Sequence, residues 1–88
     1  MKIYSNVREY ANDYKVGDIL IFPPETEPIR SIEQFRKVNA IRVEKIDDKT
    51  LYLRSCLNSN IIFYYSLGRQ RSLLVITKDE LNKLKDYY

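Results

Sequence analysis

Arginine and tyrosine are the residues of this sequence whose types and spacing best match a chemical task. A guanidinium group forms paired hydrogen bonds to phosphate oxygens, and an aromatic ring stacks on an unpaired base. Basic residues recur along the middle of the chain, interleaved with Tyr52, Tyr64 and Tyr65, so the two types can share one surface of a sheet. This combination predicts a module that binds RNA or another single-stranded nucleic acid. The candidate binding residues are Arg36, Lys37, Arg42, Tyr52, Arg54, Tyr64, Arg69 and Arg71.

The positive charge of the chain is concentrated in the same region. Residues 1–29 carry three basic and five acidic residues, whereas residues 30–76 carry nine basic and four acidic residues. The net charge of +3 therefore contains a central excess of +5. Such an excess favours a polyanion or an acidic protein surface as partner. The alternative interpretation is a solvated surface, because charged side chains of a small domain point outward in any case.

The sequence SLGRQR places Arg69 and Arg71 beside Gly68, at the tip of an expected hairpin. No acidic residue occurs from Ser55 to Ile76. Because binding residues are often carried by loops on a rigid scaffold, we expect this loop to contribute the strongest local contact. The alternative is a hydrophilic turn without a ligand.

The residue types that the chain lacks exclude several kinds of chemistry. It contains no histidine and one cysteine, which excludes imidazole catalysis, a His/Cys zinc site and an intramolecular disulfide. The acidic pairs at 47–48 and 79–80 belong to a turn and to the first turn of a helix, and Cys56 has no histidine to activate it. We expect a binding module without catalysis, cofactor or metal. A metal-independent ribonuclease that uses Lys, Arg, Tyr or carboxylate groups is left open.

Local patterns predict a small α+β domain with a short helix near the N-terminus and a second helix at the C-terminus. Asn6 is a favourable N-cap for a helix that extends to Tyr14. Thr77 and Glu80 form a capping box that opens the C-terminal helix. Both predictions rest on local spacing, since each cap pairs with a backbone group only a few residues away.

Runs of apolar and alternating residues predict five strands between these helices. Residues 19–22 form the first, and residues 38–55 form a hairpin with its turn at 47–49. A second hairpin around Gly68 joins residues 60–65 to residues 72–76, and both strands are apolar on both faces, as in central strands. Because closure removes exposed edges, we expect a small antiparallel SH3-like or OB-like barrel, as a single domain over residues 1–88.

The register of the first hairpin separates two interpretations of its arginines. A three-residue loop at 47–49 places Arg42 opposite Arg54, and like charges so placed require an anion or an acid between them, which favours binding. A loop shifted to 48–50 places Glu44 opposite Arg54 instead, as an ordinary surface ion pair.

The stretch VGDILIFPP is loosely similar to the first strand of the small messenger-RNA-cleaving toxins of toxin and antitoxin modules, which opens an SH3-like barrel. The likeness covers about ten of the 88 residues. Those toxins carry an Arg-Pro step after their first loop, whereas FRKVNAIRV stands here. No catalytic residue is therefore transferred.

Other partners fit the same composition. Tyrosine and arginine are enriched at protein interface hot spots, so the alternative function is a phage-type inhibitor that docks on a host enzyme. Ile, Lys, Asn and Tyr make up 32 of 88 residues, which suggests a low-GC genome and a phage or mobile-element accessory protein. A homodimer through residues 61–65 together with the terminal Tyr87 and Tyr88 is left open, with packing inside the chain as its alternative.

No segment of the sequence is suited to a membrane. The longest apolar run, residues 61–65, is far shorter than the roughly 20 residues that span a bilayer. The N-terminus shows no secretory signal, so we expect a cytoplasmic protein without a membrane partner.

Overall fold

The computed structural model describes residues 1–24, 28–35 and 39–85. The helical elements are α1 (Val7–Ala11), the 3-10 helix η1 (Ile32–Phe35) and α2 (Lys78–Lys85). The strands are β1 (Lys2–Tyr4), β2 (Ile19–Ile21), β3 (Ala40–Ile46), β4 (Thr50–Ser55), β5 (Ile62–Ser66) and β6 (Leu73–Ile76). All pairings are antiparallel, in the order β1-β6-β2-β3-β4-β5. The chain is therefore a small α+β fold, as the sequence predicts.

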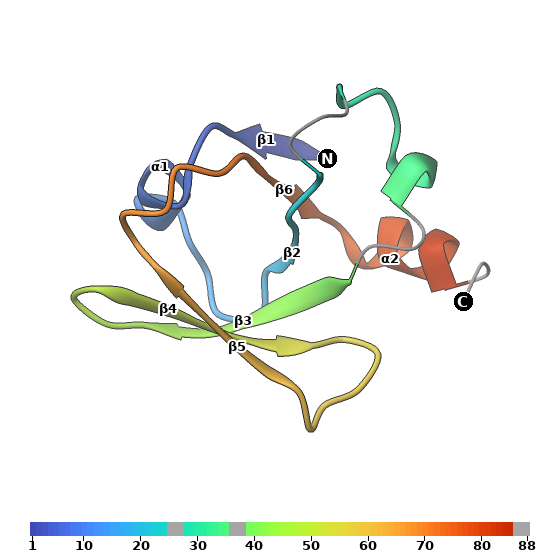
Figure 1. Ribbon diagram of the computed structural model, residues 1–88. Coiled ribbons are helices and arrows are strands. Elements are labelled where there is room, and N and C mark those ends of the chain that lie inside the picture. Colours follow the sequence, from blue (N-terminus) through green and yellow to red (C-terminus); the bar gives the residue numbers. More distant parts are fainter. Residues whose placement is uncertain (25–27, 36–38, 86–88) are drawn as a thin grey trace.

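The sheet curls strongly but does not close into a barrel, in contrast to the expectation from sequence (Figure 1). Its first and last strands in space, β1 and β5, do not pair with each other within the described residues. In the part of the chain that the structure describes, the sheet also has six strands where five were predicted. The additional strand is β1, which pairs with β6 from Lys2 opposite Val75 to Tyr4 opposite Leu73.

The predicted hairpin between β5 and β6 is wrong, because these strands are not neighbours in the sheet. β5 ends at a turn in which Gly68 donates its N–H to the Ser66 hydroxyl (3.1 Å). The chain then crosses to the other part of the sheet, where β6 lies between β1 and β2 (Figure 1). Of these two strands, β6 is covered on both faces, whereas β5 is an edge strand whose residues are exposed or half-buried.

The sheet has an apolar core on each face. On the concave face the buried residues are Tyr4, Val7, Tyr10, Leu20, Phe22, Ile41, Val43, Leu51, Leu53, Leu67 and Leu73. On the opposite face, under η1 and α2, they are Ile19, Ile21, Ile32, Phe35, Ala40, Leu74, Ile76, Leu81 and Leu84. Successive residues of a strand point to opposite faces, so adjacent residues such as Ile19 and Leu20 enter different cores. The alternating residues of the first hairpin accordingly place Ile41, Val43, Leu51 and Leu53 in the concave core.

The predicted helix caps are confirmed. Asn6 accepts the N–H of Glu9 (2.8 Å), although α1 ends at Ala11, earlier than predicted. Thr77 accepts the N–H of Glu80 (3.1 Å), and the Glu80 carboxylate accepts the N–H of Thr77 (3.0 Å). No helix among the described residues is long and apolar enough to cross a membrane.

Candidate functional site

The structure divides the predicted site residues between two surfaces, and Arg36 and Lys37 lie outside the described residues. The first surface, called here the outer face, is the convex side of β3, β4 and β5. It carries Arg42, Tyr52, Arg54 and Tyr64. The second surface holds Arg69 and Arg71, in the loop between β5 and β6. The six candidates within the described residues therefore do not share one surface.

The outer face brings the two predicted stacking residues together. The ring centroids of Tyr52 and Tyr64 are 5.2 Å apart in an edge-to-face arrangement. Lys45 places its ammonium group 4.7 Å from the centre of the Tyr52 ring. Tyr64 is 62% exposed, so one face of this pair is open to a ligand. Together with Arg54, these residues line a shallow cavity of about 280 Å³.

The hairpin beneath the outer face follows neither predicted register throughout. Asp47 donates its N–H to the carbonyl of Thr50 (3.0 Å), so residues 48–49 form a two-residue connection. A bulge in β3 then shifts the pairing by one residue. Beyond the bulge, Arg42 lies opposite Arg54, the pairing that the three-residue loop predicted.

The bulge also supplies an acid for one of these arginines. Glu44 lies at the register shift, and the Nε of Arg54 donates to its carboxylate. The terminal nitrogen of Arg54 donates to the carbonyl of Ser59. Arg54 is thus already paired with a negative charge before any ligand arrives.

A second carboxylate occupies the other end of the outer face. Asp47 accepts the N–H of Lys49 (3.0 Å), the N–H of Thr50 (2.8 Å) and the hydroxyl of Tyr52 (2.8 Å). The backbone bond from Lys49, followed by the Tyr52 hydroxyl, holds the pKa of Asp47 below its usual range. The carboxylate is therefore ionised at neutral pH and opposes a phosphate placed on this face.

The second surface combines the loop arginines with aromatic residues of β5 and the end of β2. Arg69 lies over the ring of Tyr65, with its Cζ 4.5 Å from the ring centroid. Arg71 donates to the carbonyl of Pro23 (3.1 Å). We call this surface the aromatic rim. Its residues are Phe22, Phe63, Tyr65, Arg69 and Arg71.

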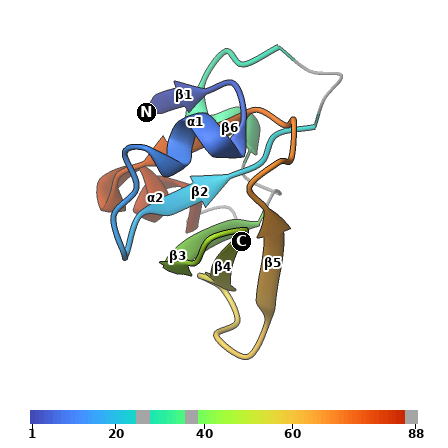
Figure 2. The same ribbon diagram turned by 90° about the vertical axis from the view of Figure 1, so that its left-hand side faces the viewer.

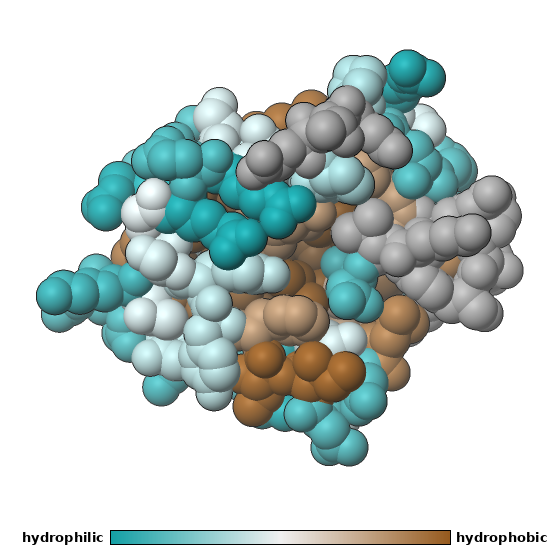
Figure 3. All heavy atoms as spheres, viewed as in Figure 1, coloured by the Kyte–Doolittle hydropathy of each residue, from teal (hydrophilic) through white to brown (hydrophobic). Residues whose placement is uncertain are grey.

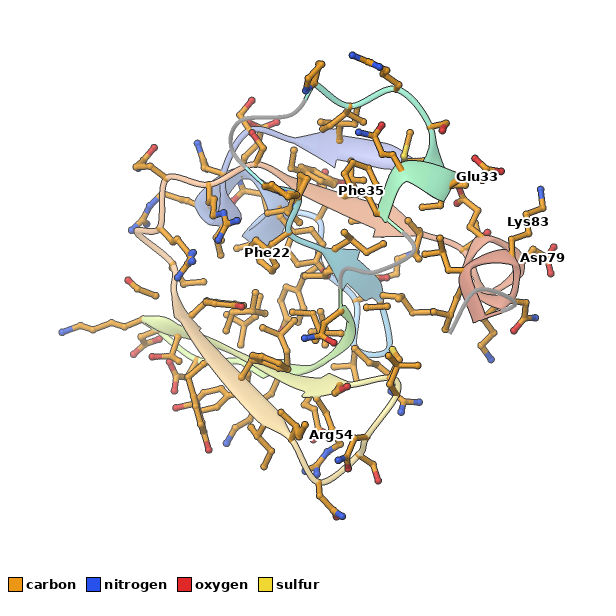
Figure 4. All side chains as sticks on the ribbon, turned by 45° about the vertical axis from the view of Figure 1, so that its right-hand side comes forward. Phe22, Glu33, Phe35, Arg54, Asp79 and Lys83 are labelled. Atoms are coloured by element: carbon orange, nitrogen blue, oxygen red, sulfur yellow. The ribbon has the colours of Figure 1, made fainter. Side chains whose placement is uncertain are left out.

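The rings of the aromatic rim form one group at the margin of the concave core. Tyr65 lies 4.7 Å from Phe22 and 6.4 Å from Phe63, measured between ring centroids, and the latter pair is nearly parallel at 19°. A small cavity of about 160 Å³ opens beside them, and Asn39 and Arg71 supply polar groups to its lining. Figure 4 shows Phe22 near β2 and Arg54 near the loop before β5, in different parts of the molecule.

Arg69 of the aromatic rim differs from Arg54 of the outer face in its charged neighbours among the described residues. No carboxylate within residues 1–24, 28–35 and 39–85 forms an ion pair with Arg69. Its Nε is buried and has no hydrogen-bond partner among those residues. Among the described residues, the guanidinium group of Arg69 thus contacts the face of the Tyr65 ring and is not neutralised by a carboxylate, which favours binding of an additional anion.

Part of this surface was not predicted from the sequence. Tyr65 was not separated from Tyr64, although strand alternation places residues 63 and 65 on the concave side and residue 64 on the outer face. That alternation could have identified Phe63 and Tyr65. The contact with Phe22 has no local signal, because it depends on how the sheet curls.

The described residues contain no group of three or more Asp, Glu, His or Cys side chains that could hold a metal ion. Comparison of the chain with protein-family models, with curated proteins and with solved structures finds no match in any of the three. A functional inference therefore depends on the geometry and charge of the outer face and the aromatic rim.

Proposed function

We propose that this protein is a small non-catalytic module that binds RNA or another single-stranded nucleic acid at the aromatic rim. The observation that carries the proposal is the position of Arg69 over Tyr65, 4.5 Å from the ring centre, with no ion-paired carboxylate among the described residues. The proposal includes a cytoplasmic location, an origin in a phage or mobile element, and an open variant of an SH3-like or OB-like barrel as scaffold.

The chemistry of the aromatic rim suits a single strand better than a duplex. Aromatic rings bind nucleic acid by stacking on bases, and bases are accessible for stacking only where they are unpaired. Phe63 and Tyr65 are half-buried, so they keep ring surface that a base can cover. Arg69 and Arg71 adjoin these rings and carry the charge that phosphates require.

The outer face is the weaker candidate despite its two tyrosines. Its Arg54 is paired with Glu44, and its Tyr52 is bonded to an ionised Asp47. A phosphate bound there would have to displace or approach these carboxylates, which lowers the gain from each contact. At Arg69 of the aromatic rim, no carboxylate of the described residues forms an ion pair that would impose this cost.

The proposal is tested by titrating a fluorescein-labelled single-stranded RNA of about ten nucleotides at low ionic strength and following its anisotropy. We expect Arg69→Gln with Arg71→Gln to weaken binding by about tenfold or more. The matched control, Arg42→Gln with Arg54→Gln, removes the same charge from the outer face and should change the affinity less than about twofold. Absence of binding by the wild type, or a larger loss in the control pair, would overturn the proposal.

The alternative function is docking on a host enzyme. It is favoured by apolar side chains that lie open on the surface: Leu57 is 46% exposed and Ile61 is 45% exposed. Figure 3 shows a hydrophobic patch over the region of β5 and the loop before it. A pull-down from nuclease-treated lysate distinguishes the two functions. One stoichiometric protein, lost with Leu57→Lys, supports docking, and loss of all partners on nuclease treatment supports nucleic acid.

A further inference from the structure

β5 is an edge strand of the sheet. Its hydrogen bonds to β4 determine which of its backbone N–H and C=O groups face away from the sheet. The N–H of Ser55 donates to the carbonyl of Ile61 at one end of this pair (3.0 Å). The N–H of Leu67 donates to the carbonyl of Lys49 at the other end (3.0 Å). Bonded residues alternate along an antiparallel ladder, so the odd-numbered residues of β5 bond to β4. The residues whose N–H and C=O face away from β4 are Ile62, Tyr64 and Ser66.

No described strand pairs with this free edge. Figure 2 shows β5 at the margin of the molecule, with no other element beyond it. The alternation of exposure along the strand agrees, because Ile62, Tyr64 and Ser66 are exposed while Phe63 and Tyr65 are half-buried. The outward N–H and C=O groups are therefore accessible to another strand.

The edge also lacks the features that usually prevent such pairing. Natural edge strands carry lysine, proline or a bulge that blocks a second chain. β5 contains none of these, and residues 55–68 include no charged side chain. Two apolar side chains stand on it in the open, Ile62 at 43% and Tyr64 at 62% exposure. A neutral, regular edge of this kind pairs without placing like charges across the new ladder.

We propose that β5 pairs in antiparallel fashion with β5 of a second copy of this chain, about a twofold axis at Tyr64. In this register Ile62 lies opposite Ser66 of the second copy, and Tyr64 lies opposite its own equivalent. These are the residues with outward backbone groups, so the pairing forms about six hydrogen bonds. Phe63 then faces Tyr65 of the second copy, a cross-strand aromatic pair that favours this register.

The pairing has a consequence for the aromatic rim, and this consequence alone rests on the proposed function. Phe63 and Tyr65 lie on the concave side of β5, so a β5–β5 ladder brings the rings of both copies onto one continuous surface. One nucleic-acid strand could then contact the aromatic rims of both copies. The pairing itself does not require a nucleic acid.

Sedimentation velocity without nucleic acid tests the pairing, at protein concentrations from about 1 to 300 µM. We expect the sedimentation coefficient of the wild type to rise with concentration. Tyr64→Pro removes an outward N–H that β4 does not use, so it should remain a monomer while keeping its circular dichroism spectrum. Tyr64→Ala is the matched control, because it loses the ring but keeps the N–H, and it should still associate.

Amide hydrogen exchange of the wild type provides a second test that needs no variant. The Tyr64 amide should exchange more slowly as the protein concentration rises, while the Phe63 amide, bonded to β4, should not change. A wild type that stays monomeric throughout the range, equal association of Tyr64→Pro and Tyr64→Ala, or a Tyr64 amide insensitive to concentration would overturn the proposal. Because no RNA is present, these outcomes are independent of the nucleic-acid proposal.

Discussion

Arg42 and Arg54 lie directly opposite each other on β3 and β4, a position at which two like charges repel. The repulsion is offset by Glu44, which contacts Arg54 from the bulge in β3. Glu44 lies at the register shift between Val43 and Lys45, so the acid that pairs with Arg54 comes from the irregular part of the hairpin.

Glu44→Gln tests this account. Because the Glu44 and Arg54 side chains are both partly exposed, we expect the free energy of unfolding to fall by less than about 1 kcal/mol at low salt. Adding Arg42→Gln should recover part of the loss, because it removes the opposed charge. Urea denaturation of the two single variants and the double variant measures the coupling. Strictly additive effects would show that Glu44 does not offset the Arg42–Arg54 repulsion.

A buried tyrosine supports the turn that leads into β2. Tyr10 is 1% exposed and donates its hydroxyl to Asp18 (2.6 Å), which also accepts the N–H of Lys15 (2.9 Å). We expect Tyr10→Phe to lower the free energy of unfolding by about 1–2 kcal/mol, because Asp18 loses a donor. Tyr14→Phe is the control, since Tyr14 is 38% exposed, and should change stability by less than about 0.5 kcal/mol. Equal effects of both variants would contradict this role.

The same tyrosine predicts a response to alkaline pH. Burial, and then the bond to Asp18, raise the pKa of the Tyr10 hydroxyl well above its ordinary value of 10.0. An unfolded chain therefore ionises Tyr10 at lower pH than the folded chain does. Stability from this group is present below about pH 10 and decreases as the pH rises further. Tyr10→Phe should show a smaller alkaline decrease, measured by urea midpoints at several pH values.

The turn of the first hairpin predicts a response to acid. The bonds to Asp47 hold its pKa below the ordinary value of 3.8, so folding favours the ionised form. The stabilising contribution is present above the unfolded pKa and is lost as the pH falls through the lower folded pKa. We expect Asp47→Asn to lose less stability than the wild type between about pH 4 and pH 2. Parallel acid profiles for the two proteins would rule out this contribution.

The elements that could be predicted from sequence are those that local chemistry determines. The caps at Asn6 and Thr77 bind backbone groups within one helical turn, and the alternation of residues 38–55 fixes which side chains are buried. Strand pairing across the molecule was not determined in this way. The runs at 60–65 and 72–76 look alike in sequence, but only the second lies between two strands.

In the candidate site too, contacts between neighbouring strands could be predicted from sequence, whereas contacts that depend on the whole sheet could not. The pairing of Tyr52 with Tyr64 follows from a hairpin and an adjacent strand, so placing them together was a sound prediction. The positions of the two carboxylates on the outer face, Glu44 and Asp47, depend on the bulge in β3 and on the hairpin turn. A shift of one residue in the pairing changes both features, so the sequence did not predict them. The contact between Phe22 and Tyr65 arises from the curl of the whole sheet, and no sequence pattern encodes that curl locally.

The salt dependence of RNA binding provides a separate measure of the aromatic rim. For single strands, the logarithm of the association constant falls with the logarithm of salt concentration by about 0.7 per phosphate contact. If Arg69 and Arg71 each neutralise one phosphate, their replacement by glutamine should reduce this slope by about 1.4. Replacement of Tyr65 by leucine should weaken binding without changing the slope, because a ring stacks on bases and neutralises no phosphate. Anisotropy titrations at four salt concentrations give both slopes, and an unchanged slope in the arginine variant would place the phosphates elsewhere.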